Sequence, residues 1–155
     1  MSLSVVLIEP RIPPNTGNIA RLCAATDTAL HLIEPLGFDI DDEQVRRAGL
    51  DYWPDVDLWR HPDWFAFRAA VARPRCIYFS AHGTRPYTAA PFAANSVLVF
   101  GNETEGMPER IRAKHADRLF RIPMRPAVRS LNLATAVGVV LYEAIRRLGL
   151  EMEPA

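Results

Sequence analysis

Lysine and net charge are both scarce in this sequence. Lys114 is the single lysine, and every other fixed positive charge on a side chain is an arginine. The formal net charge at pH 7 is zero, so gross electrostatics does not indicate a nucleic-acid partner. Arginine suits phosphate and stacked bases better than lysine does. A GC-rich genome favours arginine as well, and composition alone does not decide between these explanations.

Paired cysteines, metal-ligand spacing and long apolar runs are also missing. Cys23 and Cys76 lie far apart and form no C-x-x-C pair, which predicts reduced, buried thiols. The four histidines show no ligand spacing, so we expect no metal. No apolar run approaches the roughly 20 residues of a membrane span. Residues 1–10 carry neither a basic segment nor a cleavage-type site, and we therefore expect a cytoplasmic protein with no membrane contact.

Hydrophobic residues make up 49% of the 155 residues, which is enough to form the core of one domain. We expect a single domain over residues 1–150 and a short C-terminal tail over residues 151–155. Apolar runs predict strands at residues 3–9, 30–34, 56–59, 76–80, 96–101 and 119–122. Helices are expected at residues 41–48, 63–72, 108–114 and 131–148, and from Asn15 or Thr16 to about Ala25. This alternation predicts an α/β fold, with a mostly parallel sheet flanked by helices.

Ligands of such sheets bind beyond the carboxyl ends of the strands, and one candidate loop lies at residues 100–108, F-G-N-E-T-E-G-M-P. Gly101 allows close approach of a ligand to the backbone, and Gly106 permits a tight turn. No Lys-Ser/Thr follows the second glycine, so the loop is not a P-loop. The fingerprint G-x-G-x-x-G is absent from the chain. An ordinary strand-to-helix turn would explain the same residues.

A second candidate loop lies at residues 122–134, I-P-M-R-P-A-V-R-S-L-N-L-A. Two prolines stiffen it, and Ser130 is placed to cap the long helix that follows. Asn132 then falls inside the first helical turn, where its polar side chain adds little helix propensity. Ser130 is either a plain helix cap or, with its neighbours, a ligand contact.

A third candidate segment lies at residues 13–21, P-P-N-T-G-N-I-A-R. Asn15, Asn18 and Arg21 recur at intervals of three, so they could share one side of the first helical turns. Two amides and a guanidinium beside a strand end would suit ribose and phosphate. The alternative is a helix cap at Asn15 and a surface arginine.

Taken together, the three segments resemble the motifs of the SPOUT superfamily of RNA methyltransferases. Within it they are similar to the small tRNA ribose 2'-O-methyltransferases that modify the wobble nucleotide. The matching stretches are residues 15–24, 98–106 and 122–134, with further likeness at 33–38 and 46–52. Met107 stands where leucine is usual, and Asn102 where proline or another small residue often sits. We expect neither change to alter a polar role.

The resemblance implies a fold and an activity that the pattern alone does not. It implies a deep C-terminal trefoil knot, a homodimer with a shared RNA site, and S-adenosylmethionine as methyl donor. The implied substrate is the wobble nucleotide 34 of a tRNA, a cytidine or a carboxymethylaminomethyl-uridine of tRNA-Leu. The implied cofactor-binding residues are Phe79, Gly101, Glu103, Ile122, Met124, Ser130 and Leu131. The implied catalytic residues are Arg21, Asn15, Glu103, Ser130 and Asn132.

Arg21 carries the least certain chemistry of this set. The family analogy makes it the base that takes the proton of the ribose hydroxyl, yet a guanidinium is hardly ever deprotonated in proteins. Two hypotheses follow: Arg21 acts as a base with help from an RNA phosphate, or it holds that phosphate and stabilises the developing alkoxide.

RNA binding should depend on particular arginines, because the net charge is zero. The candidates are Arg11, Arg46, Arg47, Arg125 and Arg129, with surface solvation as the alternative for each. Tyr142, on the last helix, is expected in the core or in a dimer interface more than in an RNA contact.

Two other classes of protein compete with the methyltransferase. One is a non-catalytic RNA- or nucleotide-binding module on the same fold, which would be expected to lack the polar motif residues. The other is a nicotinamide-dependent oxidoreductase, which the missing dinucleotide fingerprint disfavours. Binding of S-adenosylhomocysteine rather than NAD would separate the methyltransferase from the oxidoreductase.

Overall fold

Seven parallel strands form one sheet in the computed structural model, which describes residues 3–71 and 75–150, with the backbone alone for 49–52. The order across the sheet is β3 (Leu58–His61), β2 (Ala29–Ile33), β1 (Ser4–Ile8), β6 (Val97–Phe100), β4 (Cys76–Phe79), β7 (Leu119–Arg121) and β5 (Arg85–Pro86). Each neighbouring pair is parallel. The α/β fold expected from the sequence is therefore confirmed. The expected tail, residues 151–155, lies outside the described residues.

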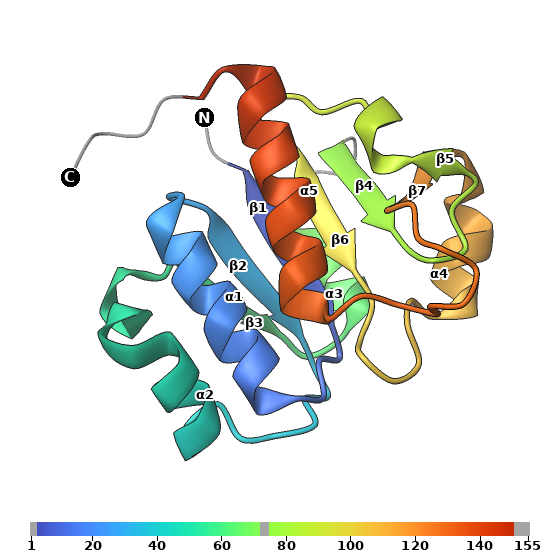
Figure 1. The fold of residues 1–155 in the computed structure, drawn as a ribbon. Helices are drawn as coiled ribbons and strands as arrows, with labels where there is room; N and C mark the ends of the chain where they lie inside the picture. Colours follow the sequence, from blue (N-terminus) through green and yellow to red (C-terminus); the bar gives the residue numbers. More distant parts are fainter. Residues whose placement is uncertain (1–2, 72–74, 151–155) are drawn as a thin grey trace.

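Helices cover both faces of the sheet (Figure 1). On one face lie α1 (Pro13–Ala25) and α5 (Leu133–Leu148), and on the other α3 (Trp64–Ala70) and α4 (Glu109–Lys114). The fifth helix, α2 (Glu43–Gly49), packs against α1. Alternate strand residues serve the two faces because successive side chains of a strand point in opposite directions. In β1, Val5 and Leu7 join the core under α1 and α5.

Four strands end at the same edge of the sheet. Leu7 of β1 pairs with Phe100 of β6, and Phe100 pairs with Phe79 of β4. Phe79 in turn pairs with Phe120 of β7. The loops that follow β1, β6, β4 and β7 therefore meet at one edge, as the alternating pattern predicted.

Both helix starts that border this edge differ from the prediction. α1 begins at Pro13 after Ile12, two residues before the expected cap, and its start makes no side-chain cap. Proline fits the first helical positions because their N–H groups have no partner inside the helix. α5 begins at Leu133, and its cap is Asn132 rather than Ser130. The Oδ1 atom of Asn132 accepts a hydrogen bond from the Thr135 amide at 3.2 Å.

The remaining differences concern short elements. The strand expected at residues 56–59 lies at 58–61, and α3 is shorter than the helix expected at 63–72, whose last residue is outside the described part. Strand β5 and the 3₁₀ turns at Leu50–Asp55, Tyr87–Ala89 and Ala116–Arg118 were not predicted. They are too short for a hydrophobic period to appear. The strand order is compatible with a trefoil knot, and the knot itself stays a prediction.

Candidate active site

A cleft of about 380 Å³ opens at the shared carboxyl edge of the strands. Its walls come from the start of α1, the loops after β4, β6 and β7, and the start of α5. The cleft gathers residues of all three motifs together with Phe79 of β4: Asn15, Gly101, Glu103, Ile122, Met124, Ser130, Leu131 and Asn132. The structure thus brings together every residue expected to bind the cofactor, and four of the five expected to be catalytic.

The loop after β6 is held in one shape by its own backbone. A Cβ on Gly101 would lie 2.2 Å from the Met107 amide nitrogen, so only glycine fits. Asn102 and Gly106 exchange backbone hydrogen bonds of 3.1 and 3.3 Å across the turn, and Gly106 has a φ of 69°. This positive φ explains the second glycine of the motif.

Asn102 has a larger role than the sequence suggested. Its Oδ1 atom accepts hydrogen bonds from the Thr104 amide, the Thr104 hydroxyl and the Glu105 amide, at 3.0, 3.2 and 2.7 Å. The side chain is 9% exposed. Asn102 therefore adds a polar role that the expectation of no polar change at this position did not include, because its side chain accepts hydrogen bonds from amides of the tight turn.

Glu103 joins this loop to the start of α1. Its Oε1 atom accepts from the Arg11 amide at 2.8 Å, and its Oε2 atom accepts from the Ile12 amide at 2.9 Å and from Asn15 Nδ2 at 3.1 Å. A helix start carries amides without partners and a partial positive charge. The carboxylate of Glu103 satisfies both needs, in place of the missing cap on α1.

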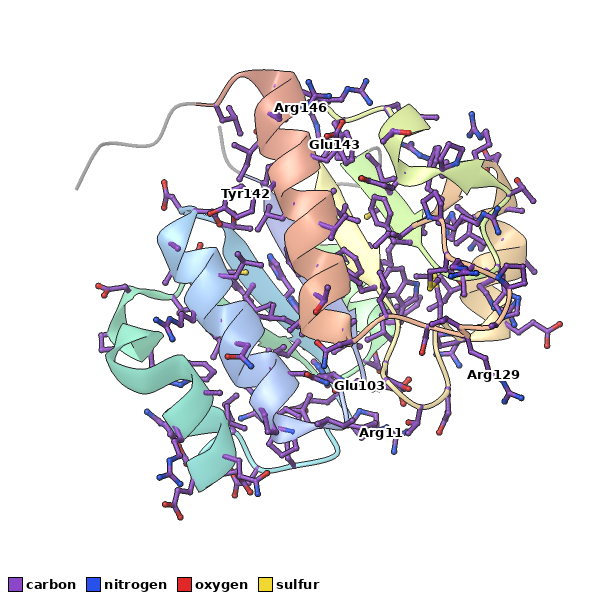
Figure 2. All side chains as sticks on the ribbon, in the orientation of Figure 1. Arg11, Glu103, Arg129, Tyr142, Glu143 and Arg146 are labelled. Atoms are coloured by element: carbon purple, nitrogen blue, oxygen red, sulfur yellow. The ribbon has the colours of Figure 1, made fainter. Side chains whose placement is uncertain are left out.

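Asn15 extends this connection to α5. Its Oδ1 atom accepts from Asn132 Nδ2 at 3.0 Å, while Asn132 Oδ1 caps α5. Asn15 is 7% exposed, although it is polar. We call Glu103, Asn15 and Asn132 the amide–carboxylate chain. It connects the starts of two helices through side chains that come from three separate motifs, and Figure 2 shows Glu103 between the two helix starts.

The opposite side of the cleft contains residues that the sequence reasoning missed. Ser80, Ala81 and His82 follow β4 and line the cleft. The Ser80 amide donates to the Phe120 carbonyl at 2.9 Å. A Cβ on Gly83 would lie 2.5 Å from the Phe120 carbonyl carbon. The signal in the sequence was the position of Ser80 directly after a buried apolar run, since the loop after each strand was expected to hold ligand contacts.

Arg21 does not line the cleft. It lies on the exposed side of α1, whereas Asn15 is buried. Each step of three residues falls short of a full helical turn by about 60°, so two steps carry Arg21 well away from Asn15. The expectation that Asn15, Asn18 and Arg21 share one side is therefore wrong.

The five arginines proposed for RNA binding are dispersed. Arg46 and Arg47 are exposed on α2, and Arg46 forms an ion pair with Asp41 at 2.8 Å. Arg11 pairs with Glu105 at 3.3 Å. Arg125 and Arg129 are exposed in the loop that borders the cleft.

The titratable groups whose pKa values shift clearly through burial lie outside the cleft. His31 Nδ1 lies 2.9 Å from His61 Nε2 in a stack with Trp59. Burial, reinforced by His61, lowers the pKa of His31 to about 4. Burial raises the pKa of Cys23 to about 12, and both cysteines are buried free thiols, as expected. Within the described residues, no three His, Cys, Asp or Glu side chains could share a metal ion. None of the described helices is long and apolar enough to cross a membrane.

The family of the chain follows from comparison with known proteins. The model of the SpoU rRNA methylase family matches residues 2–142. The chain therefore belongs to this family, as the resemblance of its motifs indicated.

Particular relatives share nearly the whole chain. A tRNA (cytidine(34)-2'-O)-methyltransferase of Aeromonas hydrophila is 50% identical over 95% of both chains. A protein of the same name from Escherichia coli K12 is 49% identical, over 95% of this chain and 94% of its own. A solved structure described as giving insight into 2-OH methylation of C/U34 on tRNA is 46% identical, with a TM-score of 0.88, over 94% of this chain and 95% of its own.

One structural relative contains a cofactor. The SpoU methyltransferase AviRb of Streptomyces viridochromogenes, solved in complex with AdoMet, is 28% identical with a TM-score of 0.79. The match covers 94% of this chain and 57% of that one.

Proposed function

We propose that this protein transfers a methyl group from S-adenosylmethionine to the ribose 2'-oxygen of nucleotide 34 of a tRNA. The observation that carries the proposal is the gathering of all three motifs in one cleft. Relatives named for this reaction, at 46–50% identity over most of the chain, support the same substrate. The intact polar residues of the motifs favour catalysis over a binding module of the same fold.

The cleft fits the proposed cofactor. Its volume, about 380 Å³, lies within the usual range of small-molecule sites. Ile122, Met124 and Leu131 offer apolar contacts, and the loops around them offer backbone donors and acceptors. The absence of a side chain at Gly101 lets the backbone of Gly106 and Met107, which also line the cleft, pack directly against it. We assign cofactor binding to Phe79, Gly101, Ile122, Met124, Ser130 and Leu131. Bound S-adenosylmethionine would supply a methyl group on a sulfonium, and this methyl is electrophilic without a metal.

The amide–carboxylate chain orients the ribose in this proposal. The Oδ1 atom of Asn132 caps α5, and one N–H of its Nδ2 donates to Asn15. Its second N–H is then available to a ribose oxygen. Both oxygens of Glu103 accept hydrogen bonds at the start of α1, so Glu103 is a positioning residue. Correct alignment of a nucleophile can supply roughly 7–11 kcal/mol of a barrier.

Arg21 acts, in this proposal, in the active site of the other subunit of a homodimer. From the exposed side of α1, it reaches the cleft of a second copy, where it holds a phosphate and stabilises the developing alkoxide. A guanidinium donates hydrogen bonds but very rarely accepts a proton, so we assign it no role as a base. Sedimentation measures the oligomeric state, and a monomer that is fully active would contradict the shared site.

Mixing two inactive variants tests the shared site directly. Arg21→Ala and Asn132→Ala are each expected to lose most activity. A mixed dimer contains one cleft with both residues intact and one that lacks both. Each mixed dimer should therefore have about half the activity of a wild-type dimer. Mixtures that stay inactive would show that Arg21 acts on its own cleft or not at all.

The reaction itself is tested with labelled S-adenosylmethionine and total tRNA that lacks the modification. We expect label in the ribose of nucleotide 34 after nucleoside mapping. Label confined to other tRNA nucleotides would contradict the assignment to nucleotide 34. Binding of S-adenosylhomocysteine without any methyl transfer would favour the non-catalytic alternative.

A further inference from the structure

The zero net charge of the chain conceals a strong separation of charge. Residues 1–63 contain 11 of the 18 acidic residues and 5 of the 18 Lys and Arg residues. Residues 64–150 contain 5 acidic and 13 basic residues. The strand order places β3, β2 and β1 from the first part on one side of the sheet and β6, β4, β7 and β5 from the second part on the other. The net charge therefore differs in sign between two parts of the chain whose strands form opposite sides of the sheet.

Two acid-free segments meet in the positive half. Residues 64–102 and 118–142 contain no Asp or Glu. They come together where β5 pairs with β7, with Pro86 opposite Arg121. Arg85 lies over the Phe120 ring at 4.6 Å and donates to the Asp117 carbonyl at 2.7 Å. These contacts position one arginine on β5 beside the arginines of β7 and its following loop.

Four exposed arginines lie on β5, on β7 and in the loop after β7, and we call them the β7-edge arginines: Arg85, Arg121, Arg125 and Arg129. Arg121 precedes Ile122, and Arg129 precedes Ser130, both of which line the cleft. Arg125 directly follows Met124, a third lining residue. Figure 2 shows Arg129 projecting outward from the loop after β7.

Arg121, Arg125 and Arg129 differ from several other arginines in their partners. Arg46, Arg60 and Arg146 form ion pairs with carboxylates at 2.8, 2.6 and 2.8 Å. Arg121, Arg125 and Arg129 have no side-chain hydrogen bond or ion pair with any described residue. No acidic residue of their own segments competes for them. Their charges are available to an external anion.

We propose that the β7-edge arginines bind successive phosphates of the RNA strand beside the nucleotide that enters the cleft. The proposal rests on the proposed function and identifies its RNA-binding surface. The guanidinium fork matches phosphate geometry, and binding to phosphates releases counterions from the RNA. The proposal retains Arg125 and Arg129 from the sequence candidates and adds Arg85 and Arg121. Arg11 and Arg46 contribute less, because carboxylates of the protein already neutralise them.

The test is the salt dependence of tRNA binding. We would measure the affinity of the full-length protein for tRNA over a range of KCl concentrations, for wild type and for Arg121→Gln, Arg125→Gln, Arg129→Gln and the triple variant. The slope of log K against log [KCl] is negative, and each lost phosphate contact should make it less steep by about 0.7–0.9. The triple variant should make it less steep by about 2–3.

Arg60→Gln and Arg146→Gln are matched controls, because each removes one arginine charge away from the cleft. Their slopes should equal that of the wild type. Equal slopes for wild type and the triple variant would overturn the proposal, as would an equal loss in the controls. Thermal unfolding checks each variant, and the single variants decide the question if the triple variant does not fold.

Two outcomes separate this surface from the proposed reaction. A protein that methylates nucleotide 34 but keeps its salt slope in all three variants would refute the surface and leave the reaction intact. A protein that binds tRNA through these arginines but transfers no methyl group would refute the reaction and leave the surface intact.

Discussion

The two sides of the cleft are built in contrasting ways. On the side of α1 and the loop after β6, the polar side chains Glu103, Asn15 and Asn132 bond to one another and to helix amides. On the side of the loop after β7, residues 125–130 are all exposed, and Arg125 and Arg129 bond to no described side chain. The first side is held by contacts within the protein itself. The second side keeps its hydrogen-bonding capacity for the ligand.

The largest expected effect tests the rigidity of the first side. Gly101→Ala places a Cβ 2.2 Å from the Met107 amide nitrogen, so the backbone must move. We expect a loss of about 3 kcal/mol in the free energy of unfolding and no measurable binding of S-adenosylhomocysteine. Chemical denaturation and calorimetry measure the two. Gly138→Ala is the control, because its Cβ would meet Leu22 only at 3.9 Å; equal behaviour of the two variants would contradict the close packing at Gly101.

A smaller effect is expected when one link of the amide–carboxylate chain is changed. Glu103→Gln keeps the shape but replaces one acceptor oxygen by an NH₂ group that faces donors. The free energy of unfolding should fall by about 1–3 kcal/mol. Combining it with Asn15→Ala should give less than the sum of the two losses, because the residues are in contact. Additive losses in a denaturation series would show that Glu103 and Asn15 act independently.

The two candidate caps of α5 give a direct comparison of the two sides. Asn132→Ala removes the observed cap and should cost about 1 kcal/mol of stability. Ser130→Ala changes an exposed side chain and should cost less than about 0.5 kcal/mol. Thermal unfolding of both variants measures the difference, and a larger loss for Ser130→Ala would restore the cap expected from the sequence.

The smallest effect is expected on the open side. Val128 is 51% exposed in the loop after β7, and Val128→Ala should change the free energy of unfolding by less than about 0.5 kcal/mol. The same truncation at the fully buried Val99 should cost more than about 1 kcal/mol. Comparable losses in urea denaturation would mean that the loop is packed rather than open.

The sequence predicted every strand except β5, the parallel sheet and nearly all of the cleft, because buried apolar runs and motif loops are local signals. It did not predict which asparagine caps α5, since Ser130 and Asn132 are both good caps and only the path of the loop decides between them. It also did not predict which side of α1 is buried, because that depends on how the helix packs against the sheet and α5; Asn15 is buried and Arg21 is exposed. Ser80 and His82 were missed because their place in the cleft depends on contacts with β7, far along the chain.

The capping of α1 by Glu103 has a consequence for synthesis of the chain. The Arg11 amide and the Glu103 carboxylate are 92 residues apart in the chain. A ribosome adds about 5–20 residues per second, so α1 emerges some 5–20 s before the group that completes its first turn. During that interval water satisfies the Arg11 and Ile12 amides. The contacts of Glu103 with this end of α1 form only after the second half of the chain, which contains β6, has been made.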